Sequence, residues 1–295
     1  MLDIIHAIPF PTWLKEEAFS LGPVSVKWYG ISYIVGITLA YLYAKRVCAK
    51  RDVWIARKEP SGPVIIPNKT ILEDYFFFAL LGIMIGGRIG SILLYDTAKY
   101  LNDPLAIFRI WEGGMAFHGG LLGVGLAVLY LARKYKVPFT RMGDIAAISA
   151  PIGIGLVRVA NFVNQELWGS ASSLPWAVIF NKDPDRIPRH PTQLYEALLE
   201  GFVLWLILYI AVHKFRALTR PGLSIGIFLA GYGLFRIWVE LYRLPDDGIT
   251  QFGFLQRGQM YSLPMVIGGA WLIYRALRKP PVSPKRVAET ADEPA

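Results

Sequence analysis

Residues 143–169 read GDIAAISAPIGIGLVRVANFVNQELWG, and this stretch changes character halfway along. Its first half is almost wholly apolar, as expected of a membrane helix. Five hydrogen-bonding side chains then follow within nine positions: Arg158, Asn161, Asn164, Gln165 and Glu166. Either the chain leaves the bilayer at this point, or a polar group is held there.

The composition of the whole chain favours a membrane protein. Of its 295 residues, 54% are hydrophobic and only 18% are charged, and the mean hydropathy is positive. A soluble domain of this size could not bury so much apolar surface. We therefore predict an all-α, polytopic membrane protein with about seven transmembrane helices. The predicted helices are residues 28–46, 73–95, 114–132, 143–162, 195–213, 222–242 and 260–277.

These helices divide the chain into three parts. Residues 1–27 are predicted to lie outside the membrane, with a short helix on its surface over residues 4–20 as one interpretation. Residues 28–279 are predicted to form the membrane domain, in which the long loop 163–194 forms an external head. The polar, proline-rich tail, residues 280–295, is predicted to be disordered.

The distribution of lysine and arginine predicts the orientation. Nineteen of these residues lie in the tail and in the loops after the first, third and fifth helices, against nine on the opposite side. Because the cytoplasmic side carries the excess, the amino terminus is predicted to be outside and the carboxyl terminus cytoplasmic. The net charge of +9 therefore needs no nucleic-acid partner to explain it.

Three arginines remain, and the prediction places all of them inside helices. An arginine near the bilayer centre costs at least about 2.5–3.5 kcal/mol on insertion scales, so Arg88, Arg158 and Arg236 each need a reason. All three fall toward the outer ends of their helices. Other polar side chains are predicted at the same height: Tyr29, His118, Asn161, Tyr195, Glu196 and Glu240.

An outward-facing cavity lined by these residues would account for them together. Guanidinium groups match phosphate oxygens in a bidentate way, and the phosphate nearest to the outer leaflet is a lipid headgroup. Glycines around His118 would let a helix or an acyl chain approach closely; they are Gly119, Gly120, Gly123 and Gly125. The residues alone thus indicate a phospholipid site with a titratable group beside it.

Each residue also has a purely structural interpretation. Arg158 could reach the outer headgroups as an anchor, and Arg236 with Glu240 could form an internal salt bridge, because residues four apart share a helix face. Asn161 and Glu166 could hold the backbone where the helix ends, and the role of Arg88 stays open. Cys48, the sole cysteine, is predicted only to pack at the cytoplasmic end of the first helix.

Several motifs resemble those of the bacterial prolipoprotein diacylglyceryl transferases. They are FHGGLLG (117–123), RVANFVNQELWG (158–169), HPTQLYE (190–196) and RIWVELYR (236–243), supported by Tyr29 in KWYG and by GGRIG (86–90). They occur in the family's order and cover nearly the whole chain. One position departs from the family pattern: Val157 stands where a glycine usually precedes the arginine.

The resemblance implies a reaction and a site in the bacterial cytoplasmic (inner) membrane. Such enzymes transfer the diacylglyceryl group of phosphatidylglycerol to the lipobox cysteine in the signal peptide of a prolipoprotein, forming a thioether and releasing glycerol phosphate. The resemblance assigns catalysis to Tyr29, His118, Arg158 and Arg236, with His118 accepting the thiol proton. Phosphatidylglycerol binding would involve Arg88, Arg158, Asn161, Glu166, Gly169, Arg236 and Glu240. No metal or cofactor is implied.

The main alternative from another class is a transporter or channel for an anion. Buried arginines and a helix interrupted by Pro151 and glycines would also serve that function. A permeation path should be polar from end to end, however, and comparable residues do not continue through the cytoplasmic half of the predicted helices. A lipid-binding protein without catalysis is a third and weaker hypothesis.

Overall fold

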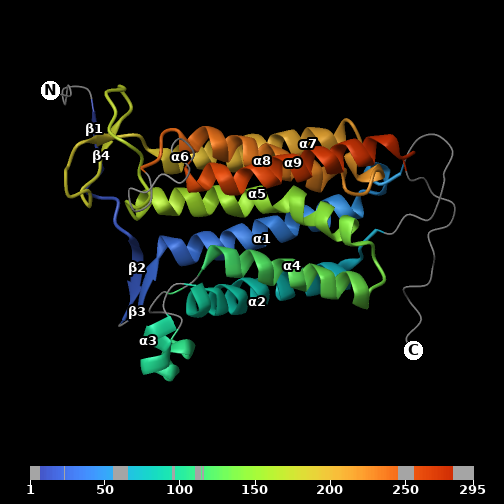
Figure 1. Ribbon diagram of the computed structural model, residues 1–295, viewed down its shortest axis with the longest axis horizontal. Helices are drawn as coiled ribbons and strands as arrows, with labels where there is room; N and C mark the ends of the chain where they lie inside the picture. The colour runs from blue at the N-terminus through green and yellow to red at the C-terminus, as the bar shows by residue number, and fades with distance from the viewer. Residues whose placement is uncertain are drawn as a thin grey trace.

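The computed structural model describes residues 7–22, 24–55, 66–94, 97–109, 114, 116–244 and 256–281. Long helices lie side by side along the long axis of the molecule (Figure 1). They are α1 (Trp28–Ala49), α2 (Lys69–Leu94), α4 (Phe117–Lys134), α5 (Phe139–Val163), α8 (Leu223–Glu240) and α9 (Arg257–Arg278). A further long helix is continuous through α6 (Thr192–Glu196), the π-helix η5 (Ala197–Val203) and α7 (Leu204–His213).

Every helix range predicted from the sequence overlaps one of these long helices. The largest boundary shifts are at α2 and α5, which each begin four residues earlier than predicted. Within the described residues, four helical segments are long and apolar enough to cross a membrane: Lys69–Leu93, Phe139–Val163, Thr192–His213 and Leu223–Glu240. The chain is therefore a mostly helical protein with membrane-spanning character.

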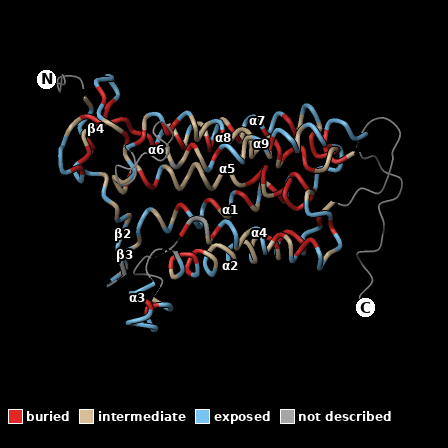
Figure 2. Tube along the Cα trace, viewed as in Figure 1, coloured by how far each residue is buried: buried red, intermediate tan, exposed pale blue. Residues whose placement is uncertain are grey.

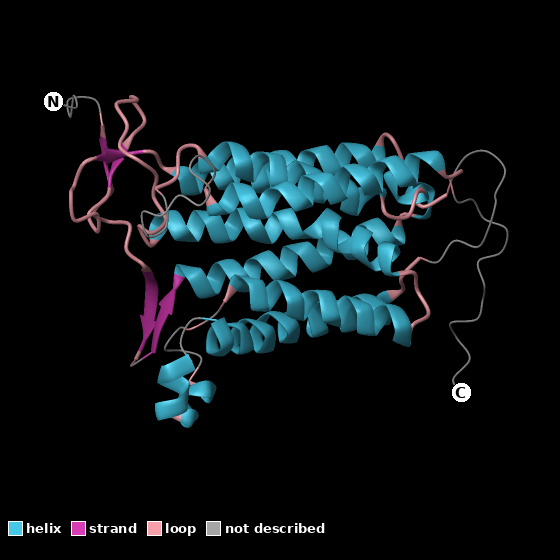
Figure 3. Ribbon diagram, in the orientation of Figure 1, coloured by secondary structure: helices cyan, strands magenta, loops and turns pink. Residues whose placement is uncertain are grey.

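Short helices and strands connect and cap the bundle (Figure 3). The short helices are η2 (Arg51–Val53), α3 (Thr97–Asn102), η3 (Pro104–Phe108) and η6 (Ala217–Thr219). The strands are β1 (Ile8–Pro9), β2 (Glu17–Leu21), β3 (Val24–Lys27), β4 (Val178–Ile179) and β5 (Pro188–Arg189). The all-α expectation is met by a mostly helical chain, but the described residues also form short strands, which gather at one end of the bundle.

The surface helix considered for residues 4–20 is wrong over the described residues 7–20. Residues 17–21 instead pair with residues 24–27 in an antiparallel hairpin, and β1 pairs in parallel with β4. The start of the chain and the loop 163–194 therefore form one small head together. A cluster of aromatic rings holds this head together, with Phe10 against Phe162 at 5.4 Å and Trp168 stacked on Phe180 at 5.6 Å between ring centroids.

Exposed and buried positions alternate along the long helices (Figure 2), and many of the exposed residues are large and apolar while several buried ones are polar or charged. Ile34, Leu93 and Ile267 are each more than two-thirds exposed, whereas Gln193 and Glu196 are fully buried. Large exposed apolar surfaces mark contact with a partner or a membrane, and helices satisfy their backbone polar groups without water. This arrangement suits a lipid environment.

Glycines set the closest helix contacts. In α2 and α4, a Cβ at Gly119 or Gly123 would overlap the backbone carbonyls of Gly86 and Gly82 respectively. Small residues spaced in this way let membrane helices pack backbone to backbone. Gly119 and Gly123 therefore allow the close approach of α2. Of the helix and the acyl chain that the sequence analysis considered, the structure shows a helix at these glycines.

At the opposite end from the strands, Asp144 joins α5 to α8. Its carboxylate accepts the backbone N–H groups of Gly222 at 2.8 Å and Ile225 at 3.1 Å, so a side chain of one helix caps the start of another. Cys48 is buried near this end, in the last turn of α1. The predicted disordered tail, 280–295, lies outside the described residues from residue 282 onward.

Candidate active site

Two of the predicted arginines meet at one carboxylate. Arg158 of α5 places its Nε 3.2 Å from Glu196 Oε2, and Arg236 of α8 donates from Nη1 to Glu196 Oε1. Arg243, just beyond α8, adds Nη1 at 3.1 Å from the same oxygen. Glu196 is fully buried, so three guanidinium groups from two separate chain segments converge on one interior charge.

Two further carboxylates complete this group. Glu240 Oε2 lies 2.9 Å from Arg236 Nη2 and 3.7 Å from Arg243 Nε, and Glu200 Oε2 lies 3.6 Å from Arg158 Nη2. We call the six residues the arginine–glutamate cluster: Arg158, Arg236, Arg243, Glu196, Glu200 and Glu240. Its three positive and three negative charges balance, which lowers the cost of burying them.

Close helix packing brings the cluster together. A Cβ at Gly201 would lie 2.6 Å from Gly155 Cα, so α5 and η5 touch backbone to backbone at that point. Arg158 follows one turn after this crossing and faces Glu196 and Glu200 of the same partner helix. The predicted same-face pairing of Arg236 with Glu240 is confirmed by their 2.9 Å contact.

The turn after α5 is fixed by hydrogen bonds of polar side chains. Asn161 Nδ2 donates to Glu166 Oε1 at 2.6 Å, and Gln193 Nε2 donates to the Glu166 carbonyl at 2.6 Å. Gln165 and Leu167 have positive φ values of 54° and 59°, a conformation that is unfavourable for such residues without support. In the structure, Asn161 and Glu166 therefore hold the tight turn beside the cluster.

Gly169 lies where three segments pass closest to one another. Its N–H donates to the His190 carbonyl at 2.8 Å, and it bridges to Arg243 of the cluster. A Cβ at this position would overlap the Tyr242 carbonyl and lie 2.7 Å from His190 Cβ. The need for glycine here comes from packing.

Tyr29 approaches the cluster through a neighbour. It lies in the first turn of α1, half-buried, with its ring centroid 5.3 Å from that of Tyr33. Tyr33 in turn interacts electrostatically with Arg158 and Glu166. Tyr29 thus lies next to a side chain whose electrostatic surroundings include Arg158.

Arg88 has a different set of contacts. Its guanidinium donates to the carbonyls of Ala106, Ile107, Arg109 and Gly114 and lies 5.1 Å from the Tyr100 ring centroid. These groups belong to the connection between α2 and α4. Arg88 is therefore buried because its guanidinium binds these carbonyls of the connection. None of these contacts involves the arginine–glutamate cluster.

His118 lies in the first turn of α4, but its side chain lies outside the described part of the structure. Its backbone position can still be compared with the other site residues. The first turn of α4, the last turns of α5 and α8 and the first turn of α6 all lie toward the end of the bundle that carries the strands (Figure 1).

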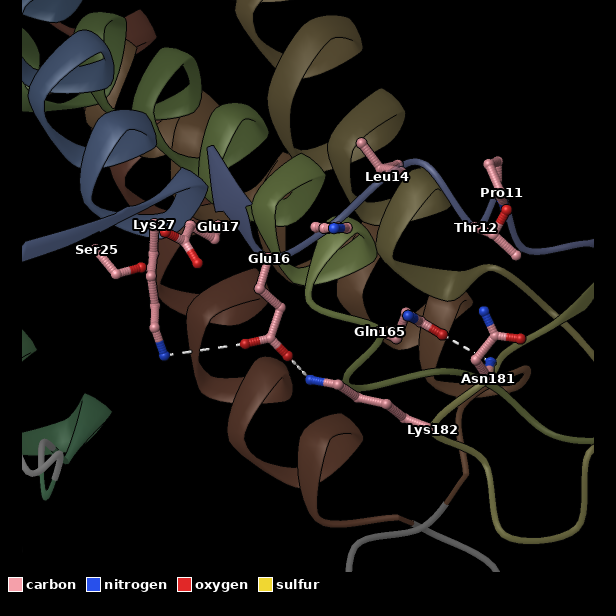
Figure 4. Close-up of a pocket in the computed structure, with 11 residues that line it drawn as sticks. Pro11, Thr12, Leu14, Glu16, Glu17, Ser25, Lys27, Gln165, Asn181 and Lys182 are labelled. Carbon is pink, nitrogen blue, oxygen red and sulfur yellow. Dashed lines mark hydrogen bonds and ion pairs between the residues drawn. The ribbon is translucent and has the colours of Figure 1, made fainter. Parts of the chain in front are cut away.

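The head and the β2–β3 hairpin enclose a cleft of about 420 Å³ on this side of the molecule (Figure 4). Three lysines line it: Lys15, Lys27 and Lys182. Glu16 pairs with Lys182 and lies 3.9 Å from Lys27, while Gln165 accepts the Asn181 N–H at 2.7 Å. Because Gln165 adjoins Glu166, the cleft borders the turn that leads to the cluster.

Two charged residues stabilise the head. Arg189 donates to both carboxylate oxygens of Asp183, at 2.5 and 2.9 Å. This hydrogen bonding holds the pKa of Asp183 below its ordinary value. Burial lowers the pKa of nearby His190, which favours its neutral form.

Among the described residues, no group of three or more His, Cys, Asp or Glu side chains could hold a metal ion.

Sequence reasoning missed part of this arrangement. Glu200 drew no attention, and Arg243 was counted only as an external cation. The spacing of Glu196 and Glu200, four residues apart in an otherwise apolar helix, was the available signal.

Apolar helices that enclose a balanced set of arginines and glutamates define a membrane protein with a buried polar site. Residues 16–275 match the family model described as prolipoprotein diacylglyceryl transferase, and the chain belongs to this family. It is 42% identical over 278 residues to the phosphatidylglycerol–prolipoprotein diacylglyceryl transferase of Bartonella bacilliformis, covering 92% of this chain and 95% of the relative. The enzyme of the same name from Brucella canis is 45% identical over 275 residues, with the same coverage. These relatives give no support to the anion-transporter alternative.

Proposed function

We propose that the chain transfers the diacylglyceryl group of phosphatidylglycerol to the lipobox cysteine of a prolipoprotein. The sulfur–carbon bond forms as the bond from the diacylglycerol carbon to the phosphate oxygen breaks. A thioether remains on the protein, and glycerol phosphate leaves with that oxygen. Family membership supports this activity, and the convergence of Arg158 and Arg236 on buried Glu196 is the structural observation that carries it.

The two arginines would bind the lipid phosphate. A guanidinium has five N–H donors. The carboxylate contacts of Arg158 use Nε and Nη2, and those of Arg236 use Nη1 and Nη2, so each retains N–H groups for phosphate oxygens. Because the glutamates fix both guanidinium planes, these donors are preorganised for the negative charge that grows on the leaving phosphate.

The thiol must lose its proton before attack, because the thiolate is the nucleophile and a free cysteine has a pKa of about 8.5. We assign this step to His118, on the strength of the FHGGLLG motif and its place at the start of α4. Tyr29 would orient groups at the edge of the site. Asn161, Glu166 and Gly169 would shape its wall, and Arg88 would hold the adjacent α2–α4 connection beside the lipid.

The proposed topology has seven spans within residues 28–279, an external amino terminus and a cytoplasmic carboxyl terminus, in the bacterial inner membrane. The lysine and arginine excess supports this orientation. It puts the cluster in the outer half of the bilayer, where a secreted precursor presents its cysteine. The head and its lysine-lined cleft (Figure 4) would then face the precursor outside the membrane.

The activity can be tested with purified protein in phosphatidylglycerol liposomes and a synthetic lipobox peptide. The expected product is the peptide with one diacylglyceryl group, detected by mass spectrometry, and a cysteine-to-serine peptide should stay unmodified. Arg158→Ala should abolish most of the product. Arg133→Ala, an exposed arginine at the far end of α4, is the matched control and should keep full activity. Absence of thioether with correctly folded protein would refute the proposal.

A further inference from the structure

Glu200 is a buried carboxylate to which the proposed reaction assigns no role. Its side chain is fully buried, and neither of its carboxylate oxygens has a hydrogen-bond partner among the described residues. It belongs to η5, a π-helical turn, and such turns occur frequently at functional sites. A buried polar group without a hydrogen bond is costly, so its presence beside Arg158 needs an explanation.

Glu200 is also the carboxylate with the least charge compensation in the arginine–glutamate cluster. Glu196 contacts three arginines, and Glu240 contacts two, the nearer at 2.9 Å. Within the described part of the chain, Glu200 forms an ion pair with Arg158 alone, at 3.6 Å. The charged and titratable groups that face it are Arg158 from α5, Glu196 from α6, Tyr232 and Arg236 from α8, and Arg243 beyond α8. Of the three glutamates, it therefore has the fewest guanidinium contacts to offset its negative charge.

The charge balance of the cluster makes this proton important. Three arginines and three glutamates sum to zero, whereas the phosphodiester of phosphatidylglycerol carries one negative charge. Binding that phosphate to Arg158 would bring it close to the negative charge of Glu200, in a site with little solvent to screen the repulsion. A neutral Glu200 would leave the cluster with one positive charge, equal and opposite to that of the lipid.

We propose that Glu200 takes up one proton when the phosphodiester of phosphatidylglycerol binds to Arg158. This inference rests on the proposed function, because it assumes that Arg158 holds the lipid phosphate. Glu200 is then a positioning residue that acts through Arg158. In the free protein its charge pairs with the guanidinium, and in the lipid complex its neutral form removes the repulsion between Glu200 and the phosphate while Glu196 still holds Arg158.

Proton uptake can be measured directly without a substitution. Phosphatidylglycerol is titrated calorimetrically into detergent-solubilised protein, without acceptor peptide, in two buffers of different ionisation enthalpy. We expect one proton to be taken up per lipid bound at a pH where Glu200 is charged in the free protein. Lipid affinity should then fall by up to about tenfold per pH unit over part of the range from pH 6 to 9, as linkage requires for one proton.

The variant Glu200→Gln is permanently neutral and nearly isosteric. It should bind phosphatidylglycerol without proton uptake and with an affinity that does not change with pH over this range. The control Glu73→Gln changes an exposed glutamate in the first turns of α2 and should behave like the unsubstituted protein. If Glu200→Gln does not fold, Glu200→Asp keeps the carboxyl group and should retain the uptake.

Two results would overturn the inference: no proton uptake by the unsubstituted protein, or full uptake by Glu200→Gln, which would assign the proton to another group. These results are distinct from a failure of the proposed function. If thioether forms but lipid binding takes up no proton, only the role of Glu200 fails. If lipid binding takes up the proton through Glu200 but no thioether forms, the proposed reaction fails.

Discussion

Glu196 should be the residue on which the stability of the bundle depends most. The substitution Glu196→Gln keeps the volume but removes the charge shared by Arg158, Arg236 and Arg243, and it turns an amide N–H₂ toward donors. Breaking a buried ion pair by removing one partner costs about 3–5 kcal/mol. For a chain of this size, each kcal/mol lowers the melting midpoint by roughly 2–4 °C, so a loss on the order of 6–20 °C is expected.

The measurement is thermal unfolding of the purified protein in one detergent, followed by a fluorescent thiol probe of Cys48, which is buried in the folded chain. Glu73→Gln is the matched control, because its pair with Lys69 is exposed and such pairs contribute about 0–1 kcal/mol. Its midpoint should stay within about 4 °C of the unsubstituted protein. If the two substitutions lower the midpoint equally, convergence of three arginines on Glu196 does not stabilise the fold.

Three further substitutions test the surrounding structure. Gly169→Ala should destabilise the protein by about 1–3 kcal/mol through overpacking, because its Cβ would overlap the Tyr242 carbonyl; thermal unfolding measures this. His118→Gln should lower transfer about 10²- to 10⁴-fold and recover in part as the pH rises toward the thiol pKa, whereas a defect that is independent of pH would exclude a role as base. Asp183→Asn should lower the melting midpoint above about pH 4, the ordinary range for an aspartate. Because Arg189 holds the pKa of Asp183 below that range, the difference should shrink as the pH falls further through the folded-state value; a constant difference in midpoint would contradict this.

The sequence predicted the helices well because length and hydropathy determine them locally. A run of about 20 apolar residues has few alternatives to a helix in a membrane. The glycines of α4 also predicted a close approach, although the sequence did not show which helix would make it. The start of the chain was less predictable. Residues 8–9 form a strand only because residues 178–179 lie beside them, and such a long-range pairing leaves no periodicity in so short a segment.

The site was predicted in part, for a similar reason. Arg158, Arg236 and Glu240 were visible as charges inside apolar helices, and the spacing of Arg236 and Glu240 also predicted their contact. Glu196 was placed at the right height, but its role as the common partner depends on how α5, α6 and α8 cross. Arg243 falls just past the apolar run of α8, where a cation is ordinary, so only the fold could bring it to the site.

The geometry of the cluster also changes what a lysine substitution can tell. Arg158 uses two nitrogens to reach two different glutamates, at 3.2 Å and 3.6 Å, and a single ammonium cannot reproduce that fork. Arg158→Lys should therefore lower transfer activity even if the lipid needs only a positive charge, because the cluster is disturbed before any lipid binds. Thermal unfolding separates the two causes. If bidentate contact with the phosphate matters in itself, activity should fall far more than the loss of stability explains, at temperatures where the variant is fully folded. An Arg158→Lys protein that transfers at the normal rate when folded would show that a general positive potential suffices and that the fork serves only to bind the glutamates.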